Sequence, residues 1–203
     1  KGFNNINIAV TTEKYSEDRI NVIFDINEGS QSKIKKISFN GNVTFSDRYL
    51  LSLINSKATN FYNIFSTGSN LNDEIFNFDV NKIISFYNQK GFFDVEVSFN
   101  IQKISKNNYI LAFFISEGKR LIINEIDIEN FDTNISKIVD KDFKKFTKNL
   151  SKNNFYYDQD LIDDYLIDVN KLLISNNIFN ETYDATLIQD NNLNRLSFIK
   201  DVF

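Results

Sequence analysis

The chain has 203 residues, of which 42% are apolar, and its 23 basic and 27 acidic residues leave a formal net charge of −4. This balance argues against a nucleic-acid partner, because phosphate binding needs a concentrated basic face. Cysteine and histidine are absent, which excludes disulfides, thiolate or imidazole metal sites, and Ser-His-Asp or Cys-His catalytic arrangements.

We therefore predict that the chain is not an enzyme and that it needs no metal, nucleotide or other cofactor. The sequence contains no glycine-rich phosphate loop. It also lacks any stretch near the roughly 20 apolar residues of a membrane-spanning helix. The chain opens at Lys1-Gly2-Phe3 without an initiator methionine, which indicates the middle of a longer protein. These features favour a protein that binds other proteins.

Residues 1–29 contain two runs in which apolar and polar side chains alternate, a pattern that predicts two paired strands. The apolar members are Ile6, Ile8 and Val10 in the first run and Ile20, Val22, Phe24 and Ile26 in the second. We interpret this segment as the C-terminal hairpin of a preceding unit.

A complete unit is predicted over residues 30–118, and it opens with a strand at Lys33–Asn40 that Gly41-Asn42 interrupts. Ser46 is expected to cap a short helix, with Asp47 in the first turn, where an anion suits the helix dipole. The apolar face of this helix is predicted to comprise Tyr49, Leu50, Leu53 and Ile54.

A second helix is expected to begin near Asn72 and to carry one continuous apolar stripe. The stripe residues recur with helical spacing and are Phe76, Val80, Ile83, Ile84 and Tyr87. Lys90 in the last turn and Gly91 just beyond it are the expected stop signals.

Two strands are expected to complete the unit. Apolar side chains alternate with polar ones from Phe93 to Ile101, which predicts a strand with one wet face. Lys103–Asn108 has the composition of a polar turn, and Tyr109–Ser116 is predicted to be a strand that is apolar on both faces. The order of elements is β-α-α-β-β, and Glu117-Gly118 closes the unit.

Residues 119–203 predict the same order with a less regular sequence. The first strand is expected at Ile122–Ile128, and Asp158 is expected to cap the second helix. Two weaker strands are predicted at Glu181–Gln189 and Asn194–Phe203. The apolar faces are Ile135, Ile138, Val139, Phe143 and Phe146 in the first helix and Ile162, Leu166, Val169 and Leu173 in the second.

Several matches recur 89 positions apart, which predicts repeated small domains. Glu28-Gly29 returns as Glu117-Gly118, and Gly2-Phe3 returns as Gly91-Phe92. The four residues Asp79-Val80-Asn81-Lys82 return as Asp168-Val169-Asn170-Lys171, and the pair Ile37, Phe39 is matched by Ile126, Ile128.

Four segments resemble parts of a POTRA module. Ile37-Ser-Phe-Asn-Gly-Asn-Val-Thr-Phe-Ser-Asp47 is similar to its first strand, Gly-Asn turn and helix start. Asp79–Val97 is similar to its second helix and the strand after it, and Ile20–Gly29 and Ile110–Gly118 resemble its closing strand. The resemblance covers nearly the whole chain and is to the POTRA-repeat region of the BamA family of bacterial outer-membrane assembly proteins.

Residues 119–203 depart from the POTRA pattern in three ways. The Phe-Ser-Asp start of the first helix is missing. Asn130 stands where the preceding module has Gly41, and Asn180 stands where it has the helix-ending Gly91. This module is therefore expected to be more divergent.

The resemblance implies an α+β fold of tandem modules, each with a three-stranded mixed sheet covered on one face by two helices. The third strand of each module is expected to be central, and the second is expected at an edge. The resemblance also implies a location on the periplasmic face of the outer membrane, with a C-terminal membrane β-barrel elsewhere in the parent chain. Unfolded outer-membrane proteins and accessory assembly proteins are the implied partners, with neither nucleic acid nor a small-molecule substrate.

The hypothesis for the mechanism is β-augmentation, in which an extended client adds a strand to an exposed edge. The predicted edge consists of Asp94, Val95, Glu96, Val97, Ser98, Phe99 and Asn100. An ordinary edge strand, whose Asp94 and Glu96 discourage unwanted pairing, would show the same pattern. For the region as a whole, a TamA-like or two-partner secretion transporter and a structural spacer are competing hypotheses.

One interpretation of the two Glu-Gly pairs is that their glutamates are catalytic carboxylates. We interpret Glu28, Gly29, Glu117 and Gly118 instead as inter-module turns, in which glycine supplies a backbone angle that other residues resist.

Overall fold

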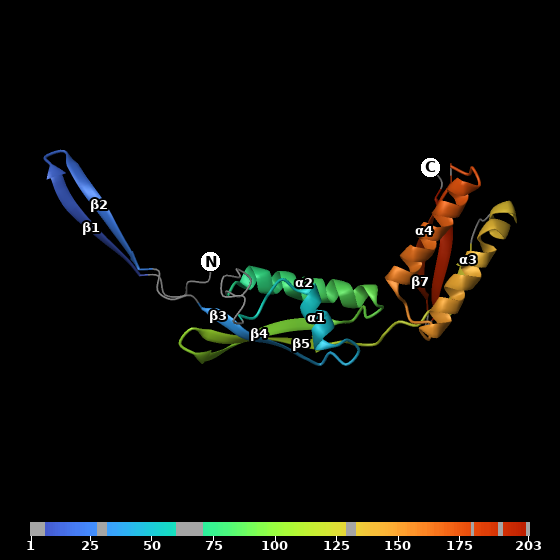
Figure 1. Ribbon diagram of the computed structural model, residues 1–203, viewed down its shortest axis with the longest axis horizontal. Coiled ribbons are helices and arrows are strands. Elements are labelled where there is room, and N and C mark those ends of the chain that lie inside the picture. Colours follow the sequence, from blue (N-terminus) through green and yellow to red (C-terminus); the bar gives the residue numbers. More distant parts are fainter. Residues whose placement is uncertain are drawn as a thin grey trace. The chain divides into compact units, whose positions relative to one another are not determined.

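The computed structural model describes residues 7–27, 32–59, 71–128, 133–179, 181–190 and 193–201, and it shows an α+β fold with separate small sheets (Figure 1). The strands are β1 (Asn7–Ser16), β2 (Arg19–Asn27), β3 (Lys33–Asn40), β4 (Glu96–Ser105), β5 (Asn108–Ser116), β6 (Glu125–Ile128), β7 (Thr182–Asp190) and β8 (Leu193–Asp201). The helices are α1 (Asp47–Leu53), α2 (Asp73–Gln89), α3 (Thr133–Lys152) and α4 (Gln159–Ser175).

The chain separates into two compact units. The first comprises the residues up to Ile84 together with Glu96–Ser116, and the second comprises Ser85–Val95 together with the residues from Glu117 onward. The last turn of α2 and the turn after it therefore belong to the second unit. The division of the chain into modules at Gly29 and Gly118 stays a prediction.

The predicted N-terminal hairpin is present. Strands β1 and β2 pair antiparallel from Asn7↔Asn27 to Ser16↔Arg19. Every side chain of both strands is exposed. Ile6 lies outside the described residues.

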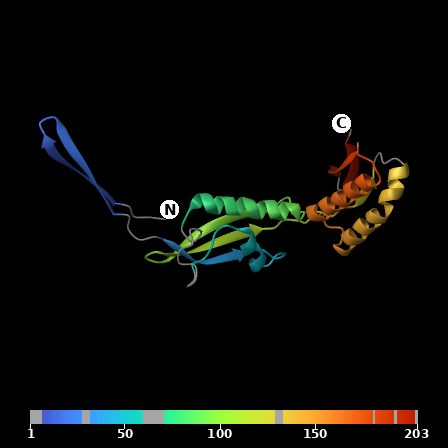
Figure 2. The same cartoon turned by 45° about the horizontal axis from the view of Figure 1, so that its top comes forward.

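The first three-stranded sheet has the strand order β3-β5-β4, with β3 parallel and β4 antiparallel to the central β5. The prediction of a mixed sheet with the third strand at its centre is confirmed. Helix α2 runs along one face of this sheet in both views (Figures 1 and 2). Phe76 of α2 meets Phe99 of β4 edge-to-face, with ring centroids 5.5 Å apart. Fully burying such a side chain stabilises the fold by roughly 1.5–3 kcal/mol.

Both predicted starts of the first unit's helices are confirmed. The Ser46 side chain accepts a hydrogen bond from the Tyr49 backbone N–H, and the Asn72 side chain accepts one from the Glu74 N–H. The predicted apolar face of α1 is partly wrong. Leu50 and Ile54 are buried, but Tyr49 is exposed because the helix ends after seven residues and only one narrow side faces the core.

The expected polar turn at Lys103–Asn108 is shorter in the structure. Strand pairing continues to Ser105↔Asn108 across a register shift, so Lys106 and Asn107 alone form the turn. The strand after it is apolar in sequence, but not all of it is covered. Phe114 is 46% exposed, because it lies on the face opposite Phe113, which is buried.

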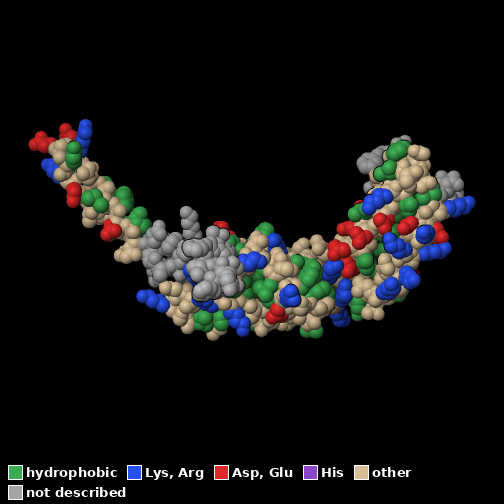
Figure 3. All heavy atoms as spheres, viewed as in Figure 1, with side chains coloured by type: hydrophobic (Ala, Val, Ile, Leu, Met, Phe, Trp, Pro, Cys, Tyr) green, Lys and Arg blue, Asp and Glu red, His purple; other side chains and the backbone are tan. Residues whose placement is uncertain are grey.

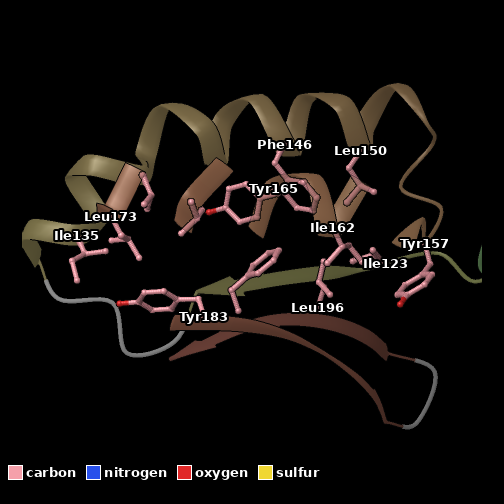
Figure 4. Close-up of a cluster of buried hydrophobic side chains, with 13 residues drawn as sticks. Ile123, Ile135, Phe146, Leu150, Tyr157, Ile162, Tyr165, Leu173, Tyr183 and Leu196 are labelled. Atoms are coloured by element: carbon pink, nitrogen blue, oxygen red, sulfur yellow. The ribbon is translucent and has the colours of Figure 1, made fainter. Parts of the chain in front are cut away.

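The second unit repeats the same architecture with the strand order β6-β8-β7, β6 being parallel and β7 antiparallel to β8. Figure 4 shows α3 and α4 on the same side of this sheet. The first strand begins at Glu125, later than the predicted Ile122. Ile122 makes only an isolated bridge with Tyr156, so no continuous ladder forms there.

The core of the second unit is aromatic at its centre. Tyr165 stacks on Phe146 and meets Phe198 edge-to-face, with ring centroids 4.8 Å away in each case (Figure 4 labels Tyr165 and Phe146). The predicted stripe residues Ile162, Val169 and Leu173 are also buried. The predicted face does not include Tyr165, although this residue lies at the spacing i+3 from Ile162 that places it there.

The four-residue match at 89 positions is a coincidence of sequence. Helices α2 and α4 both have 17 residues, and their first residues, Asp73 and Gln159, are 86 positions apart. Asp79 is fully buried, whereas Asp168 is partly exposed and pairs with Lys145. The two aspartates therefore occupy different turns of their helices and have different surroundings.

The same offset of 86 positions identifies the residue that follows α4. Gly91 follows α2 with φ +86°, and Asn177 follows α4 with φ +62°. Asparagine is among the few residues other than glycine that adopt this conformation readily. The predicted counterpart of Gly91, Asn180, lies outside the described residues.

The outer surface of α4 is acidic. Asp163 and Asp164 are exposed, and Figure 3 shows acidic side chains gathered over this helix next to basic ones. Asp158 caps the helix as predicted, by accepting a hydrogen bond from the Asp160 backbone N–H.

Candidate functional site

Strand β4 forms one edge of the first sheet. It pairs along its length with β5, from Glu96↔Ser116 to Ser105↔Asn108. Among the described residues, no strand pairs with its other side. The backbone N–H and C=O groups that point away from β5 are therefore available to an added strand.

The side chains of β4 alternate between the two faces of the sheet. Val97 and Phe99 are half-buried on the face that α2 covers, as the contact between Phe99 and Phe76 shows. Ser98 and Asn100 are exposed on the opposite face. These outward side chains are small and polar, so they leave room for a strand that approaches the edge.

The edge begins two residues later than predicted. Asp94 lies in a turn and Val95 is a buried residue outside the strand, so β4 contributes Glu96 to Asn100 of the predicted set. Gly118 explains part of this boundary. An added side-chain carbon at Gly118 would stand 3.1 Å from Asp94 Cβ, so the two segments pack closely before the strand begins.

The opposite edge of the sheet, β3, is partly occupied. The Thr59 N–H donates a hydrogen bond of 2.7 Å to the Ile34 carbonyl, which places the segment after α1 against this strand. Exposed Lys35 and Lys36 add positive charge to β3, a common device against unwanted edge pairing. Strand β4 is therefore the more accessible edge of this sheet. Strand β7 occupies the corresponding edge position in the second unit.

A hollow of about 510 Å³ adjoins the start of the β4 edge. Ser98 and Glu96 of β4 line one side, and the exposed Phe114 ring of β5 lines another. Gly41 closes the hollow near β3, with φ +86°, and an added side-chain carbon there would lie only 2.0 Å from the Ile115 carbonyl oxygen. Sequence reasoning missed this hollow, because only the sheet register places Ser98 opposite Phe114.

The Glu117-Gly118 pair has a structural role in the fold. The Tyr87 hydroxyl donates a hydrogen bond of 2.9 Å to Glu117 Oε1. Burial and this hydrogen bond raise the pKa of Tyr87 well above its ordinary value. Gly118 has φ +70°, which agrees with the predicted backbone angle. Glu28 and Gly29 lie outside the described residues.

Two further kinds of feature are absent over the described ranges. No group of three or more acidic residues is placed to hold a metal ion. No described helix is long and apolar enough to span a membrane.

The middle of the chain matches a known family. Residues 32–118 match the POTRA family, described as "Surface antigen variable number repeat". This range contains β3, α1, α2, β4 and β5, and therefore the complete first sheet.

Two curated relatives agree with this match. The chain is 28% identical over 127 residues to the outer membrane protein assembly factor BamA of Neorickettsia risticii (strain Illinois), a match that covers 62% of this chain and 17% of that protein. It is 29% identical over 136 residues to BamA of Neisseria meningitidis serogroup B, covering 66% of this chain and 17% of that protein. The crystal structure of Haemophilus influenzae BamA POTRA3-5 is 14% identical, with a TM-score of 0.42, and the match covers 97% of this chain and 72% of that one.

The chain spans 17% of the length of the two curated relatives. Residues 32–118 match the POTRA family, and the chain resembles the POTRA-repeat region of the outer membrane protein assembly factor BamA.

Proposed function

We propose that this chain is part of the periplasmic region of an outer-membrane protein assembly factor, and that it binds unfolded outer-membrane proteins by β-augmentation at β4. The observation that carries the proposal is that β4 pairs on one side only among the strands that the structure describes. The POTRA match and the names of the curated relatives support the role in assembly. Accessory assembly proteins are a second class of partner for the same edge.

The chemistry of the edge suits a receptor for many clients. Backbone hydrogen bonds to an added strand depend little on the client's sequence, so one edge accepts many extended segments. Ser98 and Asn100 present short polar side chains beside that edge. Glu96 is the single charge among residues 96–100, which limits non-specific aggregation without closing the edge.

The experiment uses two proline variants one residue apart. Backbone N–H groups alternate between the two sides of a strand, so Val97→Pro and Ser98→Pro remove donors that face opposite directions. One of the two weakens the pairing with β5, and the other removes a donor from the open edge alone. Circular dichroism and amide exchange identify the variant that stays folded. Val97→Ala and Ser98→Ala are the matched side-chain controls.

Binding is measured by fluorescence anisotropy with extended peptides that copy single strands of an outer-membrane protein. We expect the folded proline variant to lose about tenfold or more in affinity and both alanine variants to bind nearly as the parent does. Unchanged affinity in the folded proline variant would exclude β4 as the receiving strand. A structural spacer would then be the better interpretation of this region.

A further inference from the structure

The second unit contains a positively charged hollow that the edge strand does not involve. Its volume is about 400 Å³, and its lining includes Phe93, Lys119, Arg120 and Ile122. Asp94 is the single acidic residue of the lining, set against two cations. All of these residues lie within the second unit.

The Arg120 side chain is held in place before any ligand arrives. Its Nε donates a hydrogen bond of 2.7 Å to the Lys90 carbonyl. The guanidinium lies over the Tyr156 ring, 4.7 Å from the ring centroid, and 5.6 Å from that of Phe92. Burial lowers the pKa of Arg120, and nearby Asp158 offsets only part of this effect.

The terminal nitrogens of Arg120 remain available for hydrogen bonding. Within the described chain, neither donates to a protein acceptor, and neither Arg120 nor Lys119 forms an ion pair. A fixed guanidinium presents its donors as a planar fork that matches the two oxygens of a carboxylate. Lys119 is exposed beside it and supplies a second positive charge.

Part of the lining of the hollow is apolar. Phe93 is 45% exposed and Ile122 is 44% exposed. An apolar side chain next to the bound carboxylate would cover both residues and remove their surface from water. The hollow thus combines a guanidinium that can bind a carboxylate with an apolar contact surface. A short polypeptide segment in which an acidic residue adjoins an apolar one would match both features.

We propose that this hollow binds an acidic side chain of a partner protein, in a segment where the acidic residue adjoins a bulky apolar one. The charge complementarity of Lys119 and Arg120 selects the carboxylate, and Phe93 and Ile122 receive the neighbouring apolar side chain. The site is independent of strand addition, because its contacts are made by side chains of the second unit and β4 belongs to the first.

The test uses two fluorescent peptides with blocked ends, one with a central Phe-Glu pair and the other with Phe-Gln. Their affinities for the full chain are compared by fluorescence anisotropy at low and high salt. We expect the Phe-Glu peptide to bind about tenfold more tightly, and we expect salt to reduce this difference. Lys119→Gln should weaken Phe-Glu binding about threefold and Arg120→Gln about tenfold. Lys137→Gln, which removes an exposed charge from α3, is the matched control and should bind as the parent does.

Arg120 also contacts Lys90 and Tyr156, so its replacement can disturb the fold. Lys119 is exposed and makes no such contact, so Lys119→Gln decides the outcome if Arg120→Gln is not folded. The proposal is overturned if the two peptides bind alike, if neither binds, or if Lys137→Gln weakens binding as much as Lys119→Gln does.

Discussion

Replacing Asp79 by asparagine removes the charge from a fully buried carboxylate of α2. Its two oxygens accept hydrogen bonds from the backbone N–H groups of Asn55, at 2.6 Å, and Ser56, at 2.9 Å. Asparagine has the same shape but offers one acceptor and one donor, so one of these buried N–H groups loses its partner. A hydrogen bond to a charged group contributes about 1.5–3 kcal/mol. We expect Asp79→Asn to lower the free energy of unfolding of the first unit by about 2–3 kcal/mol.

Asp168→Asn is the matched control, because it changes the same letter of the same four-residue sequence in α4. Asp168 pairs with Lys145 at 3.3 Å, and both side chains are substantially exposed. Such a pair contributes little, so the expected cost is below about 0.5 kcal/mol. Urea unfolding followed by circular dichroism gives both values. Amide exchange detected by mass spectrometry assigns the loss to the correct unit. Equal costs for the two variants would refute the conclusion that the two aspartates have different roles.

Three further predictions concern close packing and charge. Gly41→Ala should lower the free energy of unfolding of the first unit by at least about 3 kcal/mol, because the added carbon needs roughly 1 Å of backbone displacement and a left-handed conformation. Urea unfolding measures this loss, and a loss below about 1 kcal/mol would contradict the prediction. Gly91→Val should destabilise the second unit by at least about 1 kcal/mol more than Gly118→Ala, since the added Cβ at position 91 would stand 2.9 Å from the Tyr157 carbonyl oxygen. Equal urea midpoints for the two variants would contradict the role of Gly91 at the end of α2. Burial opposes the charge of Lys90, but hydrogen bonds to Asp160 and Asp158 outweigh this effect and raise the pKa of Lys90. The charged Lys90 side chain therefore contributes its full stabilisation below about pH 10, and this contribution is lost as the pH rises through the higher folded-state pKa. The stability difference between the parent and Lys90→Met should therefore shrink between about pH 10 and pH 12, and a constant difference would exclude this role.

The sequence predicts most elements here because their signals are local. Helical spacing identifies α2 and α4, and Ser46 and Asp158 occupy the cap positions that their side chains favour. The central position of β5 came from the resemblance to POTRA modules, and its run of apolar residues agrees with that position. These predictions depend on few long-range contacts.

The errors have a common origin in tertiary structure. The start of β4 depends on close packing between Asp94 and Gly118, which no local pattern contains. The exposure of Phe114 depends on which face of the sheet is covered. The four-residue match gives the wrong correspondence between α2 and α4, because its identical residues lie on different turns of the two helices.

The central claim is that β4 receives a strand through its open side. Residue-resolved amide exchange of Glu96–Ser105, measured by NMR with and without a bound outer-membrane-protein peptide, tests this claim most directly. In the free protein, every second amide of β4 should be protected by β5, and the amides between them should exchange rapidly. Strand addition predicts that the bound peptide slows the rapid set by about tenfold or more and leaves the protected set nearly unchanged. A peptide that binds while the rapid amides of β4 keep their exchange rates would contradict the account.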